Sequence, residues 1–209
     1  MSTPSTDARV RAREERRERI LDAAWPLFSE HGFERVTMAQ IAAAAGVSTR
    51  TVFNHFPRKD DIVFRHDELV LTMFERSLRE RRPGQRISEA VMENALDMID
   101  LDPGYPGEFA QAVHMIAMSP TLQQRRLSMF EAHTRITRDA LLEQDPSLER
   151  GGLADGLARA MTGFHWSAME ARGAAMARGE SPEAVRETAI ETIRRGYAIL
   201  EAGFAAAGL

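Results

Sequence analysis

The chain has 209 residues, with 27 basic and 31 acidic side chains, no cysteine and a hydrophobic fraction of 44%. The lack of cysteine excludes disulfide scaffolds, cysteine-ligated zinc or iron–sulfur centres, and thiol nucleophiles. No apolar run approaches the roughly 18 residues that cross a bilayer, and the polar, arginine-rich beginning does not resemble a secretory signal. We therefore expect a cytoplasmic globular protein without a membrane partner.

The net charge of −4 is divided unevenly along the chain. Residues 1–59 hold ten basic and seven acidic side chains, a balance of +3, whereas the remainder holds 17 and 24, a balance of −7. Of the basic residues, 26 are arginine and one, Lys59, is lysine. A basic first quarter is typical of a polyanion-binding unit, although regional imbalances of this size are also common.

Apolar residues recur at helical spacing along the whole chain, and no segment alternates as a strand does. The sequence therefore predicts an all-α fold of about nine helices, three of them in an N-terminal head and the rest in a helical body. Pro26 predicts a bend in the first helix. That helix ends at His31, and the others span 37–45, 49–56, 60–82, 87–99, 108–118, 122–142, 153–177 and 182–206, with a loop at 102–107.

A tight glycine-containing turn separates the second and third predicted helices. Thr37 and Gln40 have the spacing of a capping box, Gly46 permits a positive φ, and Ser48 is a suitable N-cap. The third helix exposes short hydrogen-bonding side chains and one arginine, which suit base edges and phosphates in a major groove. A helical hairpin with a polar outer face is the alternative. The exposed side chains are Thr49, Arg50, Thr51, Asn54 and His55.

Several motifs follow one another over residues 16–64 with almost no gaps. They are Ile20-Leu21-Asp22-Ala23-Ala24, Leu27-Phe28 with Gly32-Phe33, Val36-Thr37-Met38 with Ile41-Ala42, Ala45-Gly46-Val47-Ser48, Phe53-x-x-Phe56, and Lys59 followed by acids. This set resembles the DNA-binding domain of the TetR family of bacterial transcription regulators.

The resemblance implies a division of the chain and a function. A flexible arm and the start of the first helix would occupy residues 1–15, a helix-turn-helix domain 16–58, and a ligand-binding and dimerisation domain 59–209. The protein would be a homodimeric repressor, released from a palindromic operator on double-stranded DNA by a small-molecule effector. A ligand that acts as corepressor, or activation of transcription, is the alternative.

The resemblance also implies individual DNA contacts. Thr37 and Lys59 would bind phosphates, and Arg50 would read a guanine through two donors. Phe53 stands where the family usually has tyrosine, so it offers ring packing without a phenol. The full predicted set is Thr37, Ser48, Thr49, Arg50, Thr51, Phe53, Asn54, His55 and Lys59.

The arginines before the first apolar stripe allow two interpretations. Arg9, Arg11 and Arg13 are equally compatible with a basic extension that reaches DNA and with a solvated helix. For Arg16 to Arg19 we favour a solvated helix with ion pairs four or three residues apart, such as Glu15–Arg19 and Glu14–Arg17.

Methionine and aromatic residues on the body helices are most often core, but the family resemblance favours an effector pocket. No pair of body histidines has the spacing of metal ligands, so neither a metal nor another cofactor is predicted. The candidate pocket residues are Met73, Phe74, His114, Met115, Met118, Phe130, His133, Phe164 and Met169.

The last two predicted helices offer a dimer interface. Small residues recur through 153–177, and an apolar stripe follows 182–206, although packing within one chain would explain both. The candidate interface residues are Phe164, Ala168, Ala171, Val185, Ala189, Ile193 and Tyr197.

Catalysis is not expected. The sequence contains no phosphate-binding glycine loop, no His-Glu-x-x-His motif, no nucleophile elbow and no evident carboxylate pair. A helical adaptor that binds only protein is the remaining alternative, and it predicts no role for Arg50 in binding.

Overall fold

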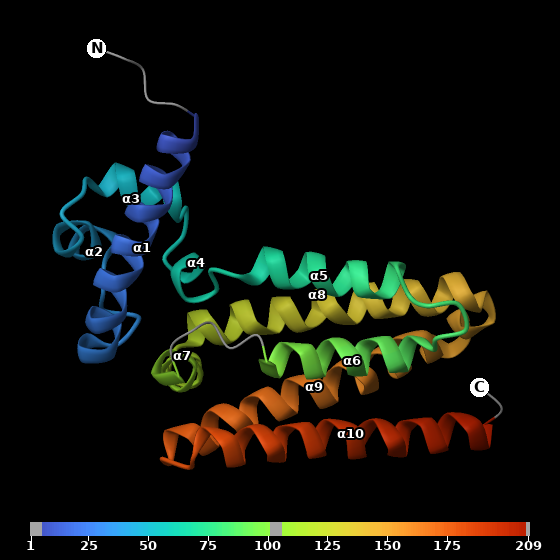
Figure 1. Ribbon diagram of the computed structural model, residues 1–209. Coiled ribbons are helices and arrows are strands. Elements are labelled where there is room, and N and C mark those ends of the chain that lie inside the picture. The colour runs from blue at the N-terminus through green and yellow to red at the C-terminus, as the bar shows by residue number, and fades with distance from the viewer. Residues whose placement is uncertain (1–5, 101–105, 208–209) are drawn as a thin grey trace.

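The computed structural model describes residues 6–100 and 106–207, and within these ranges it contains helices and their connections but no strand. The all-α prediction is confirmed. Figure 1 shows a small N-terminal head, α1–α3, at one end of a bundle of longer helices. The helices are α1 (Thr6–His31), α2 (Met38–Ala44), α3 (Thr49–His55), α4 (Asp60–Val63), α5 (Asp67–Arg79), α6 (Ile87–Asp100), α7 (Pro106–Met118), α8 (Pro120–Gln144), the 3₁₀ helix η1 (Pro146–Gly152), α9 (Leu153–Ala177) and α10 (Pro182–Ala207).

The described helices differ from the sequence prediction at two places. The helix expected over 60–82 is divided into α4 and α5, because Phe64 (φ −98°, ψ 37°) and His66 (φ −110°, ψ 2°) leave the helical region. This division gives ten α-helices in the described ranges instead of nine. The first helix begins at Thr6 and continues through Pro26, so most of the predicted arm is helical. Residues 101–105 of the predicted loop lie outside the described residues.

The head has its own apolar core, which extends into the body. Ile20, Ile41 and Val52 are completely buried there, one from each head helix. Burial of a side chain of this size contributes about 1.5–3 kcal/mol. Met115 of α7 and Leu122 of α8 belong to the same buried cluster, so the head is packed against the α7–α8 corner.

The body consists of α5–α10, in which the long helices run side by side (Figure 1). Its core joins residues of α5, α6, α8, α9 and α10. Two glycines permit close helix approach: a Cβ on Gly173 of α9 would lie 2.3 Å from Val113 of α7, and one on Gly196 of α10 would lie 2.4 Å from the ring of Phe164. None of the described helices is long and apolar enough to cross a membrane.

Candidate nucleic-acid interface

Side-chain caps fix the two short helices of the head. Thr37 Oγ1 accepts from the Gln40 backbone N–H at 3.2 Å, and Gln40 Oε1 accepts from the Thr37 N–H at 2.8 Å, which confirms the predicted capping box. Gly46 has a φ of +63°, as the turn requires. Ser48 Oγ then caps α3 by accepting from the Thr51 N–H at 3.1 Å.

The inner face of α3 is buried against the head, and its outer face is exposed to solvent. Val52 and Phe56 are buried against the head core, whereas Thr49, Arg50 and Asn54 are exposed. The Arg50 side chain forms no ion pair or hydrogen bond with any other described residue. Five more predicted contacts lie on α3 or at the N-caps of α2 and α3. Thr37 and Ser48 are exposed, Phe53 is 47% exposed, and Thr51 and His55 are half-buried.

Two of these side chains, Thr51 and His55, already interact with other residues of the chain. The Thr51 hydroxyl lies 2.8 Å from Ser48 Oγ, so both hydroxyls share a hydrogen bond. Burial lowers the pKa of His55, and Arg13, Arg16 and Arg17 lower it further. His55 is therefore neutral at pH 7, and the arginines of α1 lie close to α3.

Lys59 has a different environment from the one predicted. Its ammonium donates to the backbone carbonyls of Phe33 (2.7 Å), Glu34 (3.2 Å) and Val36 (2.8 Å). It also lies 4.3 Å from the centre of the Phe33 ring, and burial lowers its pKa. Because an ammonium has three donors and all three are engaged here, the structure argues against the direct phosphate clamp and gives Lys59 the role of fastening α4 to the loop after α1.

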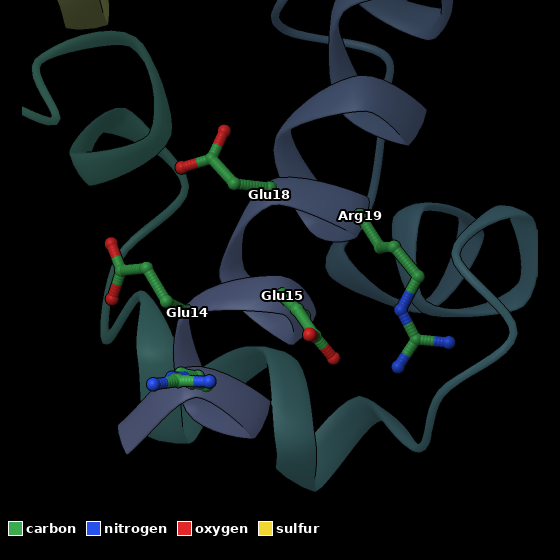
Figure 2. Close-up of a pocket in the computed structure, with 5 residues that line it drawn as sticks. Glu14, Glu15, Glu18 and Arg19 are labelled. Atoms are coloured by element: carbon green, nitrogen blue, oxygen red, sulfur yellow. The ribbon is translucent and has the colours of Figure 1, made fainter. Parts of the chain in front are cut away.

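The arginines of α1 do not form the ion pairs expected from spacing. Arg17 donates to the Arg65 carbonyl at 3.2 Å, lies 3.9 Å from Glu18, and stacks over Phe56 at 5.0 Å. It therefore holds α1 against the end of α3. Five charged side chains of α1 line a shallow surface depression. Figure 2 shows Glu14 and Glu18 on one side of the helix, Arg19 on the other and Glu15 between them.

Two polar contacts join the head to the body. Glu34, in the loop after α1, accepts from Ser119 Oγ at 2.5 Å and from Thr121 Oγ1 at 3.3 Å at the start of α8. These bonds lower the pKa of Glu34. Arg125 of α8 pairs with Asp67 of α5 at 3.1 Å and with Asp61 of α4 at 3.8 Å. The start of α8 thus contacts both the head and the α4–α5 connection.

Asp67 makes this junction sensitive to pH. Burial raises its pKa to about 6, Asp61 and Asp60 act in the same direction, and the hydrogen bond and charge of Arg125 oppose them. The pKa of Asp67 is therefore higher in the native state than in the unfolded chain, and between about pH 4 and 6 the native state binds more protons than the unfolded state. As pH rises through that interval, this carboxyl reduces the stability of the native state.

We expect the unfolding free energy of the natural chain, relative to an Asp67→Asn variant, to fall by about 1–3 kcal/mol between pH 4 and pH 7. Denaturant unfolding of both proteins at several pH values measures this difference. A difference that stays constant with pH would contradict the assignment.

The predicted pocket residues are distributed over three environments. Met115 lies in the head core, whereas Met118, Met73 and His114 are exposed, Met118 by 72%. Helical spacing alone could not tell which unit each of these residues packs into, and the pocket itself stays a prediction. Phe164 and Met169 pack against the body core. Phe74, Phe130 and His133 lie together between α5, α8 and α9, joined by Trp166, which the sequence analysis missed.

The predicted dimer stripe is mainly an intrachain surface. Val185, Ile193 and Tyr197 of α10 are buried within the chain, and the Tyr197 hydroxyl donates to the Met161 carbonyl at 2.5 Å. Ala168 and Ala189 are buried as well, and only Ala171 is exposed, with Phe164 half-buried. The five buried residues pack within the chain, because the strongest apolar stripe of a helix packs first against its own chain. The dimer interface itself stays a prediction.

No group of three histidine or acidic side chains within residues 6–100 and 106–207 could hold a metal ion. Charged and polar side chains of α1 line one shallow surface depression, and residues 124–138 of α8 contribute to a second. None of the buried body-core residues lines either depression.

The structure thus combines a capped helix-turn-helix head, whose second short helix is exposed on its outer face, with an all-α body. Residues 20–65 match the family model of bacterial regulatory proteins, tetR family. The head of this chain therefore resembles the DNA-binding domain of that family.

Known relatives share part of the sequence. The chain is 40% identical over 83 residues to the HTH-type transcriptional regulator HbdR of Aromatoleum sp., covering 37% of this chain and 36% of the relative. It is 27% identical over 136 residues to the HTH-type transcriptional repressor AcnR of Corynebacterium diphtheriae, covering 62% and 63%. Each match spans less than two thirds of the relative's length.

Solved structures extend the likeness to the body. NalD, the secondary repressor of the MexAB-OprM multidrug efflux pump in Pseudomonas aeruginosa, matches with a TM-score of 0.61 at 20% identity, covering 88% of this chain and 97% of NalD. SmeT in complex with triclosan matches with a TM-score of 0.58 at 21% identity, covering 88% and 91%. At these identities the likeness establishes a shared fold.

Proposed function

We propose that the chain is a homodimeric transcription regulator that represses genes by binding a palindromic operator, a task performed in the cytoplasm. The outer face of α3 is the observation that carries this proposal. Arg50 is exposed and unpaired among the described residues, on a helix whose cap and inner face are fixed. The relatives and neighbours that are named repressors, AcnR and NalD, support repression as the outcome.

An Arg50→Ala variant is expected to bind DNA about 1–3 kcal/mol more weakly and to lose preference at one base pair, because a bidentate contact to guanine is removed. Its stability is expected to stay within about 0.5 kcal/mol, since the side chain is exposed. Fluorescence anisotropy with DNA selected from a random pool measures the affinity. Arg194→Ala, which removes an exposed arginine from α10, is the control. Equal affinities for the three proteins would contradict the placement of α3 in the groove.

We propose a dimer interface on a different face of α9 and α10 from the buried stripe. Along α9, uncharged small residues recur every three or four positions and are exposed or half-buried. A neighbouring flank of α10 presents Ile199, which is 63% exposed. α9 and α10 approach closely where Gly196 lies against the ring of Phe164. This face consists of Gly156, Ala160, Gly163, Ser167, Ala171 and Ala174 of α9 and Thr188, Thr192, Ile199 and Gly203 of α10.

Two arginine substitutions at neighbouring positions of α10 test the proposed dimer interface. Ile199→Arg is expected to convert the dimer to a monomer, because it places a charge in a closely packed apolar contact. Ala198→Arg adds the same charge one position away, beside Glu191 and Arg194 on the solvent face, and is expected to leave the dimer intact. Sedimentation equilibrium measures both masses. Two variants with the same mass would contradict this interface.

We also propose that a small-molecule effector binds the body and changes the affinity for DNA. The triclosan complex of SmeT, and the lauroyl-CoA complex of FadR from Thermus thermophilus, are precedents within the same fold. The contacts of α8 with Glu34, Asp61 and Asp67 offer a physical connection from the body to the head. Release of DNA is the expected effect of ligand, and tighter binding would indicate the corepressor alternative.

A further inference from the structure

Buried polar side chains of the body are concentrated on α8 and α9. Of the nine buried polar or charged residues in the described ranges, five lie on these two helices. Thr134 and Thr162 share a hydrogen bond of 3.1 Å across the contact. The five residues are His133, Thr134, Thr137, Thr162 and Arg172.

Aromatic rings continue this contact toward α5. The Phe74 and His133 rings lie 4.7 Å apart, and Trp166 lies 5.8 Å from His133 and 6.1 Å from Phe130. The rings come from three helices and meet at angles between 46° and 85°. We call the group of Phe74, Phe130, His133, His165 and Trp166 the aromatic seam.

Two polar atoms of the aromatic seam are shut off from solvent without a hydrogen-bond partner in the described structure. They are Nε1 of Trp166 and Nδ1 of His165, which belong to adjacent residues with ring centres 6.1 Å apart. Buried polar groups are nearly always paired, and an unpaired one lowers stability. A ligand that supplies both partners would therefore bind in preference to one that supplies none.

The seam carries no net charge of its own at neutral pH. Burial lowers the pKa of His165 to about 4, with a smaller contribution from His133. Burial also lowers the pKa of His133, whose Nδ1 lies 2.9 Å from the Met129 carbonyl. Arg126 of α8 and Glu170 of α9 neutralise each other in an ion pair. An ionic ligand would find no compensating charge here, so the seam favours an uncharged one.

We propose that the aromatic seam is an effector subsite for uncharged aromatic compounds that carry a hydroxyl group. The hydroxyl oxygen accepts from Trp166 Nε1, and the same group completes the hydrogen bonding of His165 Nδ1, as donor or acceptor according to the tautomer. Phe130 and Trp166 are half-buried, so one edge of the seam is at the surface, and the ligand enters by separating these rings. The proposal takes from the proposed function only the idea that the body binds an effector.

The indole N–H groups provide a direct test, because the chain has two tryptophans, Trp25 and Trp166. Trp25 lies in the head core and also has an unpaired Nε1, so its signal is an internal control. The ¹⁵N–¹H indole signals of the full chain are followed while 4-chlorophenol, chlorobenzene or 4-chlorobenzoate is added. A Trp25→Phe variant assigns the remaining signal to Trp166.

We expect 4-chlorophenol to shift the Trp166 signal saturably and to bind at least about tenfold more tightly than the other two probes. A His165→Phe variant is expected to reduce this preference to about threefold or less, and its dispersed amide spectrum verifies the fold. Three equal affinities, a shift confined to Trp25, or no saturable shift would each overturn the proposal. DNA binding is measured separately, without any probe. If the probes fail to bind, the proposed regulatory function is unaffected. If the protein fails to bind DNA, the result of the probe titration still applies.

Discussion

A Lys59→Met variant is expected to lose about 2–4 kcal/mol of unfolding free energy, because three charge-assisted hydrogen bonds to backbone carbonyls disappear together. Methionine has nearly the length of lysine, so the packing against Phe33 is largely retained. The loop after α1 also carries Glu34, which contacts the start of α8. We therefore expect the head to be loosened both internally and from the body.

The salt dependence of DNA binding separates the two roles considered for Lys59. A phosphate contact contributes about −0.9 to the slope of log affinity against log salt. With Lys59 engaged inside the chain, the folded Lys59→Met protein is expected to keep the natural slope. Arg50→Met is the matched control, with natural stability and weaker binding. Unchanged stability of Lys59→Met with a slope reduced by about one would restore the phosphate clamp.

A Gly173→Ala variant is expected to lose about 2 kcal/mol of unfolding free energy. The added Cβ would lie 2.3 Å from Val113 of α7, and overpacking of this kind costs about 1–3 kcal/mol or more. The better helix propensity of alanine offsets about 0.5–1 kcal/mol of that cost. Because α7 also supplies Met115 to the head core, we expect the displacement to weaken the support of the head.

Gly156→Ala is the matched control on the same helix. A Cβ there meets no atom within 4 Å in the single chain, so propensity alone predicts a gain of up to about 1 kcal/mol. Both variants are measured by chemical denaturation in the Ile199→Arg background, which removes any effect of Gly156 at the proposed dimer face. Equal stabilities of the two alanine variants would contradict the close contact between α7 and α9.

Local features of the head could be predicted because they depend on residues three or four apart. The capping box of Thr37 and Gln40, the Ser48 cap and the turn at Gly46 are all of this kind. The bonds of Lys59 span 23 to 26 residues, and no sequence pattern distinguishes a lysine that faces DNA from one that faces carbonyl oxygens.

The body was less predictable because each apolar stripe has several potential partners. Val185 and Ile193 mark the most regular stripe of α10, which packs within the chain, while the exposed flank is marked only weakly by small residues and Ile199. Trp166 was missed because one tryptophan in a helix is typical of any core. The adjacent Phe164 and His165 were the available signal, three consecutive ring-bearing residues on one helix.

Selection of bound DNA from a random pool, followed by an anisotropy titration of the enriched sequence, tests the central claim most directly. We expect enrichment of a two-fold symmetric site, to which the natural protein binds in a salt-dependent manner and Arg50→Ala binds more weakly. A pool that remains unenriched after repeated rounds, or an enriched site bound equally well by Arg50→Ala, would contradict it.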